Sequence, residues 1–88
     1  MGYFVYILFS EKCNIHYKGF SESPFERLLE HNENKSRFTS GKGPWKMVYL
    51  EKFEAKSQAL IREKMLKRQN RKYIDWLINQ PINEMINT

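Results

Sequence analysis

The chain has 88 residues, of which 41% are hydrophobic and 15% aromatic, and its net charge is +5. This content excludes a wholly disordered chain, and the length leaves room for one hydrophobic core, so we expect a single domain over residues 1–80. The lone cysteine, Cys13, excludes an intramolecular disulfide scaffold. Because no secretory signal or membrane-length apolar window is found, we expect a cytoplasmic protein without membrane contact.

The first two predicted elements are strands. Residues 3–9 are aromatic and β-branched without alternation, which indicates a strand covered on both faces at the centre of a sheet. A short polar stretch separates them from residues 15–20, whose alternation places Ile15 and Tyr17 on one face. Strands joined so closely are expected to form an antiparallel hairpin.

The next element is a helix with a marked start. Ser23 is a favourable N-cap, Pro24 suits the first helical position, and Glu26 lies three residues after the cap, as in a capping box. We expect this helix to end near Asn34, where a polar loop rich in Ser and Gly begins.

Two faces of this helix can be assigned from spacing. Phe25, Leu28 and Leu29 lie at i, i+3 and i+4 and are predicted to form the stripe that faces the core. Arg27 and His31 are i, i+4 neighbours and share another face.

The second half of the chain predicts one more strand and two more helices. The strand is expected over residues 45–53 and the helices over 56–68 and 71–79, with Pro81 enforcing the stop. Residues 81–88 are expected to be a frayed tail. The order β-β-α-β-α-α predicts an α+β fold with a small three-stranded antiparallel sheet flanked by helices.

Positive charge is concentrated between Lys35 and Lys72, and residues 55–74 hold seven basic groups and one acid. A basic region of this kind attracts polyanions, of which nucleic acid is the commonest in cells. The alternative is that these side chains are solvated helix faces that serve solubility.

Glu63 is the one acid within that basic stretch. At helical spacing it shares a face with Ala59 and Leu66, so its carboxylate is expected to point toward the domain, where it needs a cation or a bound divalent metal as a partner. The alternative is a surface salt bridge to Lys64, Lys67 or a neighbouring Arg.

Four further side chains are candidates for chemistry. Tyr6 and Tyr17 lie on the two strands of the predicted hairpin and are either core residues or general bases; a base would need a cation nearby, such as Lys18 or Arg27, to lower the phenol pKa. Arg27 and His31 together could bind a phosphate oxygen and assist proton transfer. Their alternative is a solvated helix face.

Five segments fall in the order of a known family. They are FVY at Phe4–Tyr6, YKG at Tyr17–Gly19, ERLLEHN at Glu26–Asn32, GPWKMVYLE at Gly43–Glu51 and SQALIREKMLK at Ser57–Lys67. Together they resemble the GIY-YIG nuclease superfamily, and in particular its small single-domain stand-alone bacterial members. The resemblance implies a three-stranded antiparallel sheet flanked by helices and metal-assisted hydrolysis of phosphodiester bonds.

The resemblance also implies roles for individual residues. Tyr6 is the favoured general base with Tyr17 beside it, although which tyrosine takes the proton stays open. Arg27 matches the arginine on the scissile phosphate, His31 a nearby histidine, and Glu63 the ligand of a divalent metal, Mg²⁺ or Mn²⁺.

Two positions depart from the family pattern, with Phe4 in place of a glycine and Lys18 in place of an isoleucine. We therefore predict a metal-dependent nuclease acting on DNA rather than RNA, and the alternative is a non-catalytic nucleic-acid-binding module on the same scaffold. Larger members carry appended DNA-binding domains, so specificity here is expected to be low or supplied by a protein partner. On either reading the residues expected to contact nucleic acid are Lys18, Lys35, Arg37, Lys42, Lys46, Lys64, Lys67 and Arg71.

Overall fold

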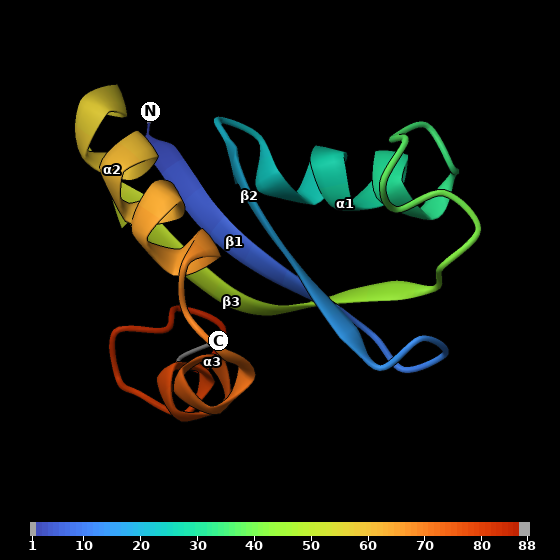
Figure 1. Cartoon of the computed structure of the whole chain (residues 1–88). Coiled ribbons are helices and arrows are strands. Elements are labelled where there is room, and N and C mark those ends of the chain that lie inside the picture. The colour runs from blue at the N-terminus through green and yellow to red at the C-terminus, as the bar shows by residue number, and fades with distance from the viewer. Residues whose placement is uncertain (1, 87–88) are drawn as a thin grey trace.

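The computed structural model describes residues 2–86 and confirms the predicted α+β fold. The element order is β-β-α-β-α-α, and the three strands form one antiparallel sheet in the order β2-β1-β3 (Figure 1). The elements are β1 (Tyr3–Ser10), β2 (Ile15–Ser21), α1 (Pro24–Asn32), β3 (Trp45–Phe53), α2 (Lys56–Lys67) and α3 (Arg71–Ile78). The sequence-based boundaries of β3, α2 and α3 are therefore correct to within one residue.

The central strand β1 is covered on both faces, as its continuous apolar run predicted. Val5 and Ile7 pack with α2 and α3, whereas Tyr6 and Leu8 point to the opposite face, which α1 covers through Leu28. Figure 1 shows α1 separated from α2 and α3 by the strands. The sheet thus divides the domain into two cores, and the α1 side holds the candidate catalytic residues.

The register of the sheet decides which residues meet across the strands. Tyr6 on β1 lies opposite Gly19 on β2. Between β1 and β3 the pairing shifts after Ile7, because Ile7 pairs with Tyr49 but Leu8 pairs with Met47. Strand β3 therefore carries one extra residue, Val48, between these two pairs, and an irregularity of this kind bends the strand that carries it.

The start of α1 is confirmed at Pro24, but the predicted capping box is wrong. The Ser23 side chain makes no capping hydrogen bond, and the Ser23 backbone N–H donates instead to Ser21 Oγ at 2.9 Å. The helix ends at Asn32, two residues before Asn34, whose left-handed backbone (φ 63°) does not continue it.

The predicted inward stripe of α1 is largely wrong. Phe25 and Leu29 are 56% and 59% exposed, and only Leu28 packs against the core. The buried residues of the helix are Pro24 and His31, so the side that faces the sheet is the one that carries His31. The physical reason is that His31 satisfies its ring nitrogens inside the domain, which lets a polar side chain take the place of an apolar one.

The segment after α3 is fixed to the sheet where we expected fraying. Asn83 is fully buried; its Oδ1 accepts from the backbone N–H of Leu50 at 3.0 Å, and its Nδ2 donates to the carbonyl oxygens of Val48 and Ile78, both at 2.8 Å. Residue 1 and residues 87–88, which belong to the predicted domain and tail, lie outside the described residues. Within residues 2–86, the helices are too short and too polar to cross a membrane.

Candidate active site

The phenol of Tyr6 reaches the candidate site by crossing β2 at a glycine. Tyr6 is only 1% exposed, and a Cβ atom on Gly19 would lie 2.5 Å from both the Cζ atom and the hydroxyl oxygen of Tyr6. Any side chain at position 19 would therefore have to displace the ring. The glycine of the YKG motif thus has a steric role that its place in the motif alone did not reveal.

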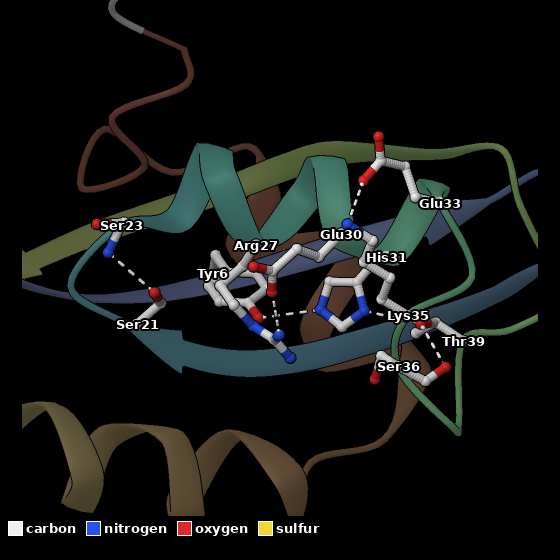
Figure 2. Close-up of polar contacts among 10 residues, drawn as sticks. All are labelled: Tyr6, Ser21, Ser23, Arg27, Glu30, His31, Glu33, Lys35, Ser36 and Thr39. Atoms are coloured by element: carbon white, nitrogen blue, oxygen red, sulfur yellow. Dashed lines mark hydrogen bonds and ion pairs between the residues drawn. The ribbon is translucent and has the colours of Figure 1, made fainter.

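A chain of buried polar groups begins at this phenol. The Tyr6 hydroxyl lies 3.2 Å from His31 Nε2, and His31 Nδ1 lies 2.7 Å from Thr39 Oγ1 (Figure 2). The Thr39 hydroxyl has one proton, which it donates to the Ser36 carbonyl oxygen at 3.4 Å. With the hydroxyl proton so directed, Thr39 accepts from Nδ1–H of His31, and in this tautomer Nε2 accepts the Tyr6 hydroxyl proton.

Burial sets the protonation state of this chain. Burial lowers the pKa of His31, and the positive charge of Arg27 lowers it further. Burial also raises the pKa of Tyr6 to about 12, although hydrogen bonding to Arg27 opposes this shift. At neutral pH the pair is thus a protonated phenol beside a neutral imidazole, and both pKa shifts oppose proton transfer between them while no substrate is bound.

Arg27 lies one helical turn before His31 and supplies the cation of the site. Its guanidinium points toward the Tyr6 phenol in Figure 2 and forms an ion pair with Glu30 Oε1 at 2.5 Å. The side chains of Arg27 and Glu30 are 36% and 42% exposed, so an incoming anion can reach the guanidinium. The predicted shared face of Arg27 and His31 is confirmed.

Tyr17 lies beside this group and nearer the surface. Its ring centroid is 4.8 Å from that of His31 and 6.4 Å from that of Tyr6. The structure therefore brings the two candidate tyrosines together around one imidazole.

Glu63 approaches the site from α2, on the other side of β2. Its neighbours on the helix, Ala59 and Leu66, are fully buried, and the Glu63 side chain is only 19% exposed. Its carboxylate is close enough to Tyr6 to raise the pKa of that phenol, and it pairs with Lys67 Nζ at 3.6 Å. The inward direction predicted for Glu63 is confirmed, and the salt bridge considered as its alternative is formed as well.

The donor set at Glu63 fits a hydrated divalent cation. Residues 2–86 contain no group of three or more His, Cys, Asp or Glu side chains that could hold a metal ion together. Mg²⁺ usually keeps several water ligands and binds proteins through one or two carboxylates plus substrate phosphates. A partly buried carboxylate whose partner is an exposed lysine suits that mode and does not suit a closed protein cage.

The predicted nucleic-acid-binding residues divide into two groups. Three of them border the site: Lys18 and Lys67 line a depression of about 320 Å³ next to Tyr17, and Lys42 Nζ lies 4.0 Å from the centroid of the Phe38 ring. These cations surround the tyrosine side of the candidate site.

The remaining basic residues make other contacts. Lys64 lines a separate groove on α2, and Arg37 is exposed in the loop after α1. Lys46 Nζ lies 4.0 Å from Glu11 Oε1, and Lys35 Nζ lies 3.2 Å from Glu33 Oε1. The Arg71 guanidinium donates to the backbone oxygen and the Oδ1 of Asn14, at 2.8 and 2.7 Å. Arg71 thus holds the β1–β2 turn, a role that spacing did not indicate.

Two residues of the loop between α1 and β3 escaped prediction, namely Thr39 and Phe38. Thr39 is fully buried, and Trp45 Nε1 donates to its carbonyl oxygen at 3.1 Å. Asn32 closes this loop by accepting from the Trp45 backbone N–H at 2.6 Å. A loop has no periodicity from which such contacts could be predicted, so only the nearby tryptophan and asparagine hint that it is fixed.

Comparisons with known proteins show a family and several relatives. The model of the GIY-YIG catalytic domain matches residues 2–79. A UPF0213 protein of Listeria monocytogenes is 34% identical over 86 residues, which cover 93% of each chain, and one of Clostridium perfringens is 38% identical over 71 residues, 77% of this chain and 73% of the relative. The solution NMR structure of a UPF0213 protein from Bacillus halodurans matches with a TM-score of 0.60 and 26% identity over 93% of this chain and 87% of that one.

Proposed function

The chain belongs to the GIY-YIG family, and on that premise we propose that it is a metal-dependent endonuclease that hydrolyses phosphodiester bonds in DNA. One observation carries the proposal: the phenol of Tyr6, the imidazole of His31 and the guanidinium of Arg27 meet at the edge of the sheet that Glu63 approaches from α2. Phosphodiester hydrolysis requires a proton acceptor and positive charge around one phosphate, and this group provides both.

In the proposed mechanism Tyr6 and His31 move the proton together. The Tyr6 oxygen accepts a proton from the attacking water while its own proton passes to His31 Nε2, 3.2 Å away. The water oxygen bonds to phosphorus as the P–O bond to the leaving ester oxygen breaks, and the leaving alkoxide takes a proton from solvent. His31 becomes an imidazolium whose Nδ1–H remains directed at Thr39, so the number of protons is conserved. We assign the transfer to Tyr6, because its hydroxyl has this acceptor, and place Tyr17 beside the reacting group.

Arg27 binds the scissile phosphate in this proposal. A guanidinium forms paired hydrogen bonds with phosphate oxygens and stabilises the charge that grows on them in the transition state. The negative phosphate would also offset the effect of Arg27 on His31, which favours protonation of the imidazole. Substrate binding thus prepares the proton acceptor.

Glu63 is the proposed ligand of Mg²⁺ or Mn²⁺. Bound there, the divalent ion would supply positive charge to the phosphate oxygens and make water more acidic. Glu63 would exchange Lys67 for the ion, which would free the lysine ammonium for the DNA backbone.

A cleavage assay tests the proposal. Purified protein is incubated with supercoiled plasmid, a branched DNA or a structured RNA, in Mg²⁺, Mn²⁺ or a chelator. Glu63→Gln is compared with Glu54→Gln, which changes an exposed carboxylate in the same way. We expect metal-dependent DNA cleavage by the wild type and Glu54→Gln, and at least a ~100-fold slower reaction for Glu63→Gln.

A non-catalytic nucleic-acid-binding module is the second candidate, and the resting ion pair between Glu63 and Lys67 favours it. In that case the Glu63 carboxylate only reduces the positive charge of the basic surface around it. Salt-sensitive binding without cleavage in any metal, with equal or tighter binding by Glu63→Gln, would contradict the nuclease and support the module. Cleavage of RNA alone would contradict the choice of DNA.

A further inference from the structure

An exposed aromatic ring stands next to the candidate site. Phe38 is 52% exposed, and its ring centroid is 5.7 Å from that of Tyr17, with the ring planes at 33°. Its neighbour in the chain, Thr39, is fully buried against His31 and holds this part of the loop in place. Phe38 therefore lies on an anchored part of the loop and presents about half of its surface to solvent.

Positive charge surrounds this ring. Lys42 Nζ lies 4.0 Å from the centroid of the Phe38 ring. Phe38 also lines the depression of about 320 Å³ together with His16, Tyr17, Lys18 and Lys67. An aromatic face bordered by ammonium groups is the combination with which proteins bind single strands, because bases stack on the ring and phosphates contact the cations.

We propose that this depression binds an unpaired nucleobase, stacked on Phe38, of the strand whose phosphate Arg27 holds. This inference rests on the proposed function and names the form of its substrate. A base inside a duplex has both faces covered by its neighbours, so only an unpaired base offers a face to the ring. A depression of this volume is at the lower limit of small-ligand sites, which suits a single nucleotide.

Lys42 has a specific part in this arrangement. In the absence of a base, its ammonium interacts with the Phe38 ring. Lys42 is not part of the lining of the depression, so its ammonium would add positive charge beside a stacked base. Lys18 and Lys67 line the same depression and would hold the backbone on the side of Glu63.

The test measures stacking without cleavage. A single-stranded DNA oligonucleotide carrying a fluorescent purine analogue is titrated with the protein in a chelator, and both analogue quenching and anisotropy are recorded. Phe38→Ala is expected to lose the quenching and to raise Kd about fivefold or more. Phe38→Trp is expected to keep both. Phe25→Ala serves as the matched control, because Phe25 is 56% exposed on α1 and belongs to no part of the site.

Three results would overturn the subsite. They are equal quenching by Phe38→Ala and wild type, equal quenching of the analogue inside a duplex, and a Phe38→Ala effect on the melting temperature alone. The quenching result and the cleavage result test the subsite and the nuclease separately. Quenching without cleavage in metal would retain the subsite and contradict the nuclease, whereas cleavage without quenching would do the reverse.

Discussion

Two buried tyrosines occupy opposite faces of the same sheet, and their partners differ in charge. On the α2 side, the Tyr49 hydroxyl donates to Glu51 Oε1 at 2.5 Å, and Arg62 Nε donates to the same oxygen at 2.9 Å. The Glu51 and Arg62 side chains are only 11% and 19% exposed. Burial, and then the hydrogen bond to Glu51, raise the pKa of Tyr49, so its hydroxyl stays protonated.

On the α1 side, Tyr6 meets a neutral imidazole instead of a carboxylate. His31 is its acceptor, and the nearest cation, Arg27, pairs with a half-exposed Glu30 at the surface. In the network around Tyr49, the Glu51 carboxylate pairs with the Arg62 guanidinium inside the domain. In the network around Tyr6, the Arg27 guanidinium stays accessible to solvent. The comparison teaches that the charges around Tyr49 compensate each other inside the domain and serve stability, whereas Tyr6 has a neutral imidazole and an accessible guanidinium beside it, which a substrate can reach.

The largest expected effect is on stability. Arg62→Met leaves the Glu51 carboxylate buried without its cation, and the free energy of unfolding is expected to fall by about 3–5 kcal/mol. Arg27→Met removes a half-exposed pair and is expected to cost at most ~1 kcal/mol. Urea denaturation measures both. Equal losses would show that the two networks do not differ in this way.

The next effect is on catalysis, and here the larger loss is expected on the α1 side. Tyr6→Phe removes the proposed base and is expected to slow DNA cleavage at least ~100-fold. Tyr49→Phe has the same size change on the other face and is expected to leave the cleavage rate within about twofold while costing ~1–3 kcal/mol of stability, because Glu51 loses a donor. Initial cleavage rates at matched folded fractions distinguish them, and a normal rate for Tyr6→Phe would move the base to Tyr17.

The sequence predicted the elements well because each had a local cause. Pro24 marks the start of α1, the uninterrupted apolar run of β1 marks a central strand, and the Arg27–His31 spacing correctly places both side chains on one face. Periodicity failed at Phe25 and Leu29, which are exposed. The periodicity rule places apolar residues toward the core and takes no account of tertiary hydrogen bonds. Those hydrogen bonds allow His31 to occupy the buried side of the helix.

Contacts made by loops could not be predicted. Thr39 meets His31 only because the chain turns back between α1 and β3, and Asn83 reaches the backbone of β3 only because the segment after α3 folds onto the sheet. Such partners are set by tertiary structure, and single polar residues in a loop carry no periodic pattern.

A smaller effect is expected where Thr39 positions the imidazole. Thr39→Val removes the acceptor of His31 Nδ1–H, so the imidazole no longer favours the tautomer that accepts from Tyr6. The cleavage rate is expected to fall about tenfold, the equivalent of one hydrogen bond. Thr39→Ser retains the hydroxyl and is expected to restore the rate and its pH profile. Failure of Ser to restore them would indicate that the threonine methyl group acts through packing alone.

The smallest expected effect is the pH dependence of stability on the α1 side. Burial and then Arg27 lower the pKa of His31 from 6.5, while Glu30 partly opposes them. As pH falls below about 6.5, the unfolded chain therefore binds a proton at this histidine before the folded chain does, so stability decreases.

Thermal melts between pH 7.5 and pH 5 measure this dependence. Burial also lowers the pKa of His16, the other histidine of the chain. Wild type and His16→Asn should therefore both lose stability on acidification, because both keep His31. The stability of His31→Gln should depend less on pH than that of the wild type. If His31→Gln and wild type had the same slope, the imidazole would not be held neutral by burial. The His31 pKa would then be the same in the folded and the unfolded chain, which would contradict the desolvated imidazole described for the α1 side.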